Sequence, residues 1–316
     1  MTEKENRPWL VAVWPGMGHV AISAGYYLMA KLGMQYMGEF AANGVFDVDV
    51  ALIKSGIVQK TQKPRSRFYR WKNPVGNRDI IVFIGEAQPP LGKYSFCEKL
   101  IDFARDQGVE RVFTFAAMAT EMHPEHDSRL FGAATDHTTL DEIDRPEIRV
   151  LEEGHIGGLN GVLLAAAADK GMEGICLLGE MPHLFAQIPF PKASLAVLRS
   201  FTEMAEIRLD FSELESQAHT IEQQLGEVLA KVEQKMAGEP ALSSEEFSAT
   251  EEPRLSERDQ ERLERLFDDA SLDRSKAYEL KSELDRLEVF DEYEDRFLDL
   301  FKHSDSDSQN ESDEAS

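Results

Sequence analysis

Short apolar runs alternate with longer stretches of helical length in the first two thirds of the chain. Residues 9–14 (WLVAVW) are apolar and are followed by Pro15 and Gly16, after which residues 19–33 continue at helical length. This order predicts a strand, a tight turn and a helix.

The same alternation returns further along the chain. Buried strands are predicted at residues 79–86, 111–119 and 174–181, and helices are predicted at residues 97–108 and 193–207. Strands that are continuously apolar and separated by helices are typical of a mainly parallel sheet covered on both faces. We therefore predict one α/β core domain over residues 1–211.

The periodicity changes after residue 211. In residues 212–237 apolar side chains recur three or four positions apart, which predicts an amphipathic helix that packs on the core or on a partner. These positions are Leu214, Ala218, Ile221, Leu225, Val228 and Val232. Residues 238–255, rich in Ser, Glu and Pro, predict a flexible linker. We expect a helical extension over 256–302 and a disordered acidic tail over 303–316.

Charge sharpens this division. The 316 residues contain 58 Asp and Glu against 34 Lys and Arg, so the net charge is −24. Residues 1–211 hold 27 acids and 22 bases (net −5), whereas residues 212–316 hold 31 and 12 (net −19). A broadly basic surface for nucleic acid is therefore excluded, and anionic membranes are disfavoured as partners.

Cysteine content and hydropathy indicate the compartment. Cys97 and Cys176 lie in apolar stretches, and no apolar run approaches the roughly 18 residues of a membrane span. We predict a cytoplasmic protein without cofactor. His123, His126 and Asp127 have spacing that resembles a metal site, but Pro124 and the lack of further ligands argue against one, so we expect no metal.

Two glycine-rich turns are candidates for anion or ligand binding. Gly16, Met17, Gly18 and His19 follow the first strand, and Gly157, Gly158 and Asn160 precede an alanine-rich helix. Amide groups at such turns can hold an anion. However, neither turn completes a dinucleotide or phosphate-loop motif, so we favour a structural role. We expect Asn160 to cap the helix that follows it.

Three residues are candidates for acid–base chemistry. Glu180 and His183 follow the strand at 174–181, at the sheet edge where α/β proteins place their sites, and His155 lies in the second glycine-rich turn. No serine or cysteine occupies a nucleophile-elbow motif. We therefore favour structural positions for all three.

A basic segment spans residues 50–78, which contain no acid. Its patch consists of Lys60, Lys63, Arg65, Arg67, Arg70 and Lys72, with Phe68, Tyr69 and Trp71 interleaved. This pattern alone is typical of nucleic-acid contact, but the overall acidity opposes it. The alternatives are a solvated hairpin and a surface for an acidic partner. Our hypothesis is that the patch docks the acidic tail of the same or a neighbouring molecule.

Several segments together resemble the proteasome assembly chaperone 2 family of archaea and bacteria. They are PWLVAVWPGMGHVAISAGYYLMAKLG, IGEAQP, GHIGGLNGVLL, CLLGEMPH and PFPKASLAVL, and the likeness extends over roughly residues 9–237. The resemblance implies a phosphorylase/hydrolase-like α/β sandwich and a homo-oligomer, a trimer or larger. It also implies a chaperone-like role toward proteasome-like or other ring-forming subunits. Ring-binding members can end in a hydrophobic–Tyr–any-residue motif, which the final residues Asp313–Ser316 do not match.

The second hypothesis is an enzyme. The implied fold also suits a nucleoside phosphorylase or hydrolase, and family members are sometimes labelled ATP-grasp-like. Such an enzyme would use the Gly16–Met17–Gly18 turn together with Glu180 and His183. Because fold alone does not determine activity, we rank the binding protein first.

Overall fold

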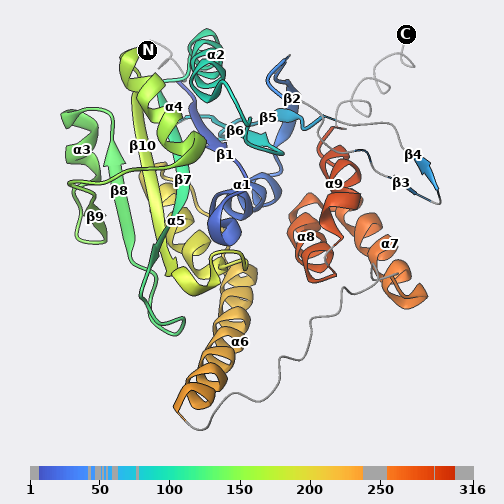
Figure 1. The fold of residues 1–316 in the computed structure, drawn as a ribbon. Helices are drawn as coiled ribbons and strands as arrows, with labels where there is room; N and C mark the ends of the chain where they lie inside the picture. Colours follow the sequence, from blue (N-terminus) through green and yellow to red (C-terminus); the bar gives the residue numbers. More distant parts are fainter. Residues whose placement is uncertain are drawn as a thin grey trace, which may run out of the picture.

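The protein was analysed as a computed structural model (Figure 1). It describes residues 7–41, 44–46, 51, 53–54, 56–58, 63–75, 78–237, 255–287 and 289–302. The predicted linker, apart from Leu255, and the predicted tail at 303–316 lie outside these residues.

The core is an eight-stranded sheet in the order β2-β5-β6-β1-β7-β10-β8-β9. The four central strands β6, β1, β7 and β10 are mutually parallel, as are β8 and β9, whereas β2–β5, β5–β6 and β10–β8 pair antiparallel. The strands are β1 (Trp9–Val13), β2 (Gln35–Glu39), β5 (Ser66–Trp71), β6 (Ile80–Gly85), β7 (Arg111–Thr120), β8 (Leu130–Ala134), β9 (Ile148–Val150) and β10 (Glu173–Pro182). A separate hairpin joins β3 (Ile53–Lys54) to β4 (Ile57–Val58). The predicted mixed, mainly parallel sheet is confirmed.

Helices cover both faces of this sheet (Figure 1). They are α1 (Val20–Lys31), α2 (Lys93–Asp106), α3 (His137–Ile143), α4 (Gly158–Asp169), α5 (Pro191–Met204), α6 (Ser212–Ala237), α7 (Glu257–Leu272), α8 (Ala277–Arg286) and α9 (Phe290–Asp299). Three short 3₁₀ helices are η1 (Met17–His19), η2 (His183–Phe185) and η3 (Arg274–Lys276).

Side chains of strand β1 contribute to the apolar cores on both faces of the sheet. Trp9, Val11 and Val13 enter the core that includes side chains of α1 and α5, whereas Leu10 and Ala12 enter the core formed with α2 and α4. Side chains of a strand alternate between the two faces. An uninterrupted apolar run is therefore what a strand needs when helices lie on both sides of it.

The last helices form a further layer beside α1. We call residues 255–287 and 289–302, which contain α7, η3, α8 and α9, the C-terminal unit. In Figure 1 this unit, drawn in orange and red, lies beside α1. Tyr26 of α1 stacks edge-on with Phe290 and Phe297 of α9. Helix α6 buries Leu214 and Leu225 in the apolar core, whereas its Val228 is 47% exposed. The domain division remains a prediction.

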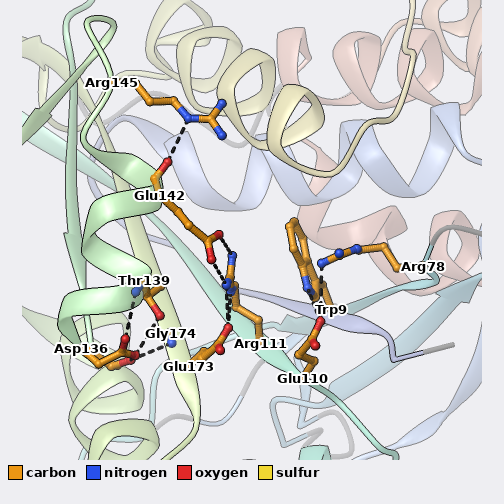
Figure 2. Close-up of polar contacts among 11 residues, drawn as sticks. Trp9, Arg78, Glu110, Arg111, Asp136, Thr139, Glu142, Arg145, Glu173 and Gly174 are labelled. Atoms are coloured by element: carbon orange, nitrogen blue, oxygen red, sulfur yellow. Dashed lines mark hydrogen bonds and ion pairs between the residues drawn. The ribbon is translucent and has the colours of Figure 1, made fainter. Parts of the chain in front are cut away.

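The amino ends of the central strands are closed by a polar network (Figure 2). Arg111, at the start of β7, donates to Glu142 of α3 at 2.5 Å and to Glu173 of β10 at 2.6 Å. The guanidinium groups of Arg78 and Arg111 lie 4.0 and 5.1 Å from the ring centroid of Trp9, on either side of it (Figure 2). This edge is thus occupied by structural ion pairs, and the candidate residues Glu180 and His183 lie at the opposite edge, at the carboxyl end of β10.

Candidate functional site

The first glycine-rich turn lies at the carboxyl end of β1 and is held by its own backbone. Gly18 and His19 adopt left-handed φ values of 58° and 50°. The Gly18 amide donates to the Ala186 carbonyl at 2.8 Å, and the Gly18 carbonyl accepts from the Phe190 amide at 2.9 Å. The His19 amide donates to Gly16. These bonds tie the turn to the loop after β10, and the Gly18 and His19 amides already have acceptors.

The second glycine-rich turn begins α4, but Asn160 is not its cap. Gly157 occupies the N-cap position, and the Asn160 Oδ1 atom is buried without a hydrogen-bond partner among the residues that the structure describes. The expectation for Asn160 was wrong because the helix starts at Gly158, whose φ of 68° turns the chain into it. Asn160 therefore lies within the first turn.

Gln88 joins the two turns. Its Nε2 donates to the Pro15 carbonyl at 3.1 Å, and its Oε1 accepts from the Leu159 amide at 3.1 Å. The side chain thereby takes the place that an anion would occupy at the start of α4. Both glycine clusters are thus brought to one edge of the sheet and are closed there by a neutral amide. The signal for Gln88 in the sequence is its position in the segment IGEAQP.

Glu180 lies near the end of β10 and is 1% exposed. Its carboxylate accepts from the Arg129 guanidinium, with 2.5 Å between Nε and Oε2, and from the Thr120 hydroxyl at 2.7 Å. The bond from Arg129 is the main reason that the pKa of Glu180 lies below its ordinary value. A carboxylate that is ionised and occupied on both oxygens is a poor general acid or base.

His183 and His155 differ in their positions. The exposed His183 places its Nδ1 atom 3.1 Å from the Thr120 carbonyl, so Thr120 contacts both His183 and Glu180. His155 is exposed in the loop before α4. A cleft of about 550 Å³ adjoins Glu180 and is lined by Thr120, Glu121, Met122, His126, Asp127, Arg129 and Glu180. The structure thus brings two of the three candidates together, around Thr120, which sequence analysis had not singled out.

All three arginines of the basic patch have acidic partners. Arg67 is 2% exposed and pairs with Glu86 at 2.8 Å and with Asp295 of α9 at 2.7 Å. Arg65 also pairs with Asp295, and Arg70 pairs with Asp79 at 2.6 Å. Lys63 and Lys72 are exposed, and Lys60 lies outside the described residues. The docking hypothesis named residues 303–316, which are not described, whereas the acidic contact seen here comes from α9.

Two further expectations concern metals and membranes. The His123 and His126 rings lie 5.6 Å apart, but nowhere in the described part of the chain do three or more His, Cys, Asp or Glu side chains gather as metal ligands. Among the same residues, no helix combines the length and apolar character needed to cross a bilayer.

The fold and the edge geometry define an α/β sandwich whose glycine-rich turns are closed by internal hydrogen bonds. The chain belongs to the PAC2 family, because the family model matches residues 10–229. This confirms the resemblance found in the sequence.

Known relatives agree with this family and fold. An uncharacterized protein of Methanocaldococcus jannaschii is 28% identical over 231 residues, which are 72% of this chain and 84% of that protein. The crystal structure of Pyrococcus furiosus PbaB, described as an archaeal proteasome activator, has a TM-score of 0.59 at 26% identity and covers 74% of this chain and 96% of PbaB. A Mycobacterium tuberculosis proteasome-assembly chaperone homologue has a TM-score of 0.61 at 21% identity, covering 71% and 95%.

Proposed function

We propose that the protein is a homo-oligomeric, assembly-chaperone-like binding protein that acts on proteasome-like or other ring-forming subunits in the cytoplasm. The observation that carries the proposal is the PAC2 family match over residues 10–229, joined to structural similarity to a protein described as an archaeal proteasome activator. In this proposal the protein needs no cofactor and performs no catalysis.

The polar groups at the carboxyl ends of the strands support binding rather than catalysis. Glu180 is bound by Arg129 and Thr120, and Gln88 bridges the two glycine-rich turns. Groups that already have partners inside the protein gain little by engaging a substrate. The edge therefore offers shape and apolar surface more readily than reactive groups.

Apolar side chains at the carboxyl ends of β1 and β10 are suited to binding a client, by which we mean an unassembled ring subunit. Met17, Leu184 and Ile188 are 47%, 64% and 40% exposed, and the bond between Gly18 and Ala186 holds their two loops together. An unassembled ring subunit exposes the apolar surface that its permanent neighbours will later cover. We place the client contact on these loops.

The test is binding to separately purified, unassembled proteasome α and β subunits, followed by light scattering and native mass spectrometry. We expect a complex with at least one subunit and weaker binding by Leu184→Glu. The matched control is Val75→Glu, at an 81% exposed position between β5 and β6. Absence of any complex would contradict the proposed function. Equal binding by both variants would show that Leu184 is not part of the client contact.

The cleft beside Glu180 keeps the enzyme hypothesis testable. Its Arg129 side chain is 46% exposed and could face an anionic substrate. Thermal unfolding with phosphate, nucleosides and nucleotides separates the two hypotheses, because a ligand at 100 times its Kd stabilises a protein by about 2.7 kcal/mol. We expect no shift with any of them, and a saturable shift would favour the enzyme.

A further inference from the structure

Buried apolar side chains hold the helices of the C-terminal unit together and join the same apolar core as the side chains of α1. Leu263 and Phe267 of α7 and Leu280 and Leu284 of α8 are at most 3% exposed. Arg296 of α9 donates to Glu264 of α7 at 2.6 Å, which ties the last helix to the first. The unit begins after residues 238–254 and lies wholly beyond the family match, which ends at residue 229. It is therefore a coherent helical element added to the family core.

Aromatic side chains dominate its contact with the core. Tyr26 of α1 lies 5.3 Å from Phe290 and 5.6 Å from Phe297, measured between ring centroids. Tyr27 of α1 lies 4.5 Å from Tyr278 of α8. Phe290 and Phe297 lie seven residues apart on α9 and so share one side of this helix, and Phe301 follows just beyond its end. Aromatic anchors of this kind are typical of the centres of protein–protein interfaces.

Polar and ionic contacts accompany these anchors. The Tyr26 hydroxyl donates to Glu294 at 2.7 Å, and Asp295 accepts from Arg67 at 2.7 Å. The Tyr36 amide of the outermost strand β2 donates to the Phe301 carbonyl at 3.1 Å. The Tyr26 hydroxyl, the Arg67 guanidinium and the Tyr36 amide can each form hydrogen bonds with water when the C-terminal unit is displaced. An aliphatic side chain exposed in the same way cannot. The contact thus has the mixed polar composition of an interface between separable domains.

We propose that the face formed by α1 and β5 is a protein-docking surface and that the C-terminal unit of this chain is its separable occupant. The recognised element is an acidic aromatic helix, with Asp295 pairing to Arg65 and Arg67 and the phenylalanines covering Tyr26 and Tyr69. Any other protein that binds this face must displace the unit. This inference goes beyond the proposed function, which concerns the loops at the carboxyl ends of the strands.

The test starts from the folded full-length protein, retains both of its parts after cleavage, and measures whether the C-terminal unit exchanges between molecules. A specific protease site is placed within residues 238–254, and the folded protein is cleaved there. Cleaved protein with a fluorophore on the unit is then mixed with an excess of unlabelled cleaved protein. We expect the two pieces to remain together on gel filtration and the label to move between copies. Asp295→Ala should weaken retention of the unit about tenfold, the change expected when a charge-assisted contact worth about 1.4 kcal/mol is lost.

Glu292→Ala is the matched control, because it removes the same charge from an exposed position of α9. We expect it to behave like the unsubstituted chain. The proposal is overturned if the label does not exchange between copies, or if the unit separates and fails to rebind. Equal effects of the two substitutions would overturn the assigned role of Asp295. None of these outcomes bears on ring-subunit binding, which is measured separately.

Discussion

Glu180 is a carboxylate that stabilises the end of β10 through its ionised form. Arg129 is the main cause of its lowered pKa, and the Thr120 hydroxyl contributes in the same direction. A carboxyl whose pKa is lower in the folded state stabilises the fold above its unfolded pKa, and this contribution is lost as pH falls through the folded pKa. Glu180 thus contributes to stability at neutral pH.

We predict that Glu180→Gln lowers the free energy of unfolding by about 1–3 kcal/mol at pH 7, because the Arg129 and Thr120 donors lose a charged acceptor. The difference from the unsubstituted protein should shrink below the ordinary glutamate pKa of 4.5. Chemical denaturation at a series of pH values measures this. Glu121→Gln, at a 93% exposed side chain of the same cleft, is the control. A difference that persists at low pH would contradict the ionic explanation.

Glu294 shows the opposite behaviour. Burial is the main cause of its raised pKa, nearby Glu86 and Asp291 add to the rise, and Tyr26 and Arg67 oppose it. The folded state therefore favours the protonated carboxyl. As pH rises from the ordinary value of 4.5 through the raised folded pKa, the carboxyl ionises at a cost and stability falls.

We predict that Glu294→Gln stabilises the contact of α9 with α1 by up to about 1 kcal/mol at pH 7 and flattens its dependence on pH. The glutamine oxygen can still accept from Tyr26. Hydrogen exchange of α9 amides between pH 5 and pH 8, corrected for intrinsic exchange rates, reports the effect, with Glu292→Gln as control. A loss of protection in Glu294→Gln at neutral pH would show that the charge itself holds the helix.

Among single residues, sequence analysis identified Glu180 and Arg67 but not the residues that pair with them. Glu180 was identified because it follows a buried strand, yet Thr120 and Arg129 approach it only when β7 and β8 pair with β10. Asp295 likewise meets Arg67 across 228 residues of sequence. Such pairings depend on register and on the docking of helices, which no local pattern records.

At the scale of elements, the central strands were predictable and the outer ones were not. Strands β1, β6, β7 and β10 lie between two helical layers and read as continuous apolar runs. Strand β2 (QYMGE) is only partly buried and contains a glycine, and β5 (SRFYRW) was interpreted as a basic patch. Strand β5 lies one position in from the edge strand β2, and its apolar pattern is interrupted because Arg67 is buried by ion pairs with Glu86 and Asp295.

Strand β10 packs closely against α5 at Gly179. A Cβ atom on Gly179 would lie 2.5 Å from the Ala193 carbonyl oxygen and 2.9 Å from the Ala193 Cβ. We predict that Gly179→Ala destabilises the protein by about 1–3 kcal/mol, because α5 must move away from the strand. Thermal and chemical denaturation measure this. Gly16→Ala is the control, since its extended backbone leaves the added atom nothing within 4 Å, and an equal loss there would contradict the steric explanation.

At the scale of the whole molecule, charge is organised by pairing between distant segments. The acid-free segment at 50–78 would attract a polyanion if its arginines were free, but Arg65, Arg67 and Arg70 are paired with Glu86, Asp295 and Asp79. The excess negative charge of the C-terminal third is therefore partly used to neutralise the core. The net charge of −24 indicated that nucleic acid is an unfavourable partner, but it did not reveal this compensation.

We predict no binding of single-stranded DNA or RNA by the full chain at about 10 µM protein in 50 mM salt, conditions under which proteins with free phosphate-binding patches associate measurably. Fluorescence anisotropy of labelled oligonucleotides tests this. Asp295→Ala serves as the sensitised variant, because it removes the α9 carboxylate that pairs with Arg65 and Arg67 and leaves them with Glu86. Salt-dependent binding by the unsubstituted chain would revive the nucleic-acid hypothesis.

Because the C-terminal unit is covalently linked to the core, a free partner must exceed a threshold concentration before it displaces the unit. An occupant in the same chain competes as though it were present at roughly millimolar concentration, and dilution of the protein does not change this. A free partner at micromolar concentration that binds the α1 and β5 face only as tightly as the unit does would therefore gain little occupancy. Only a partner that binds much more tightly, or that is itself multivalent as an assembled ring is, could displace the unit.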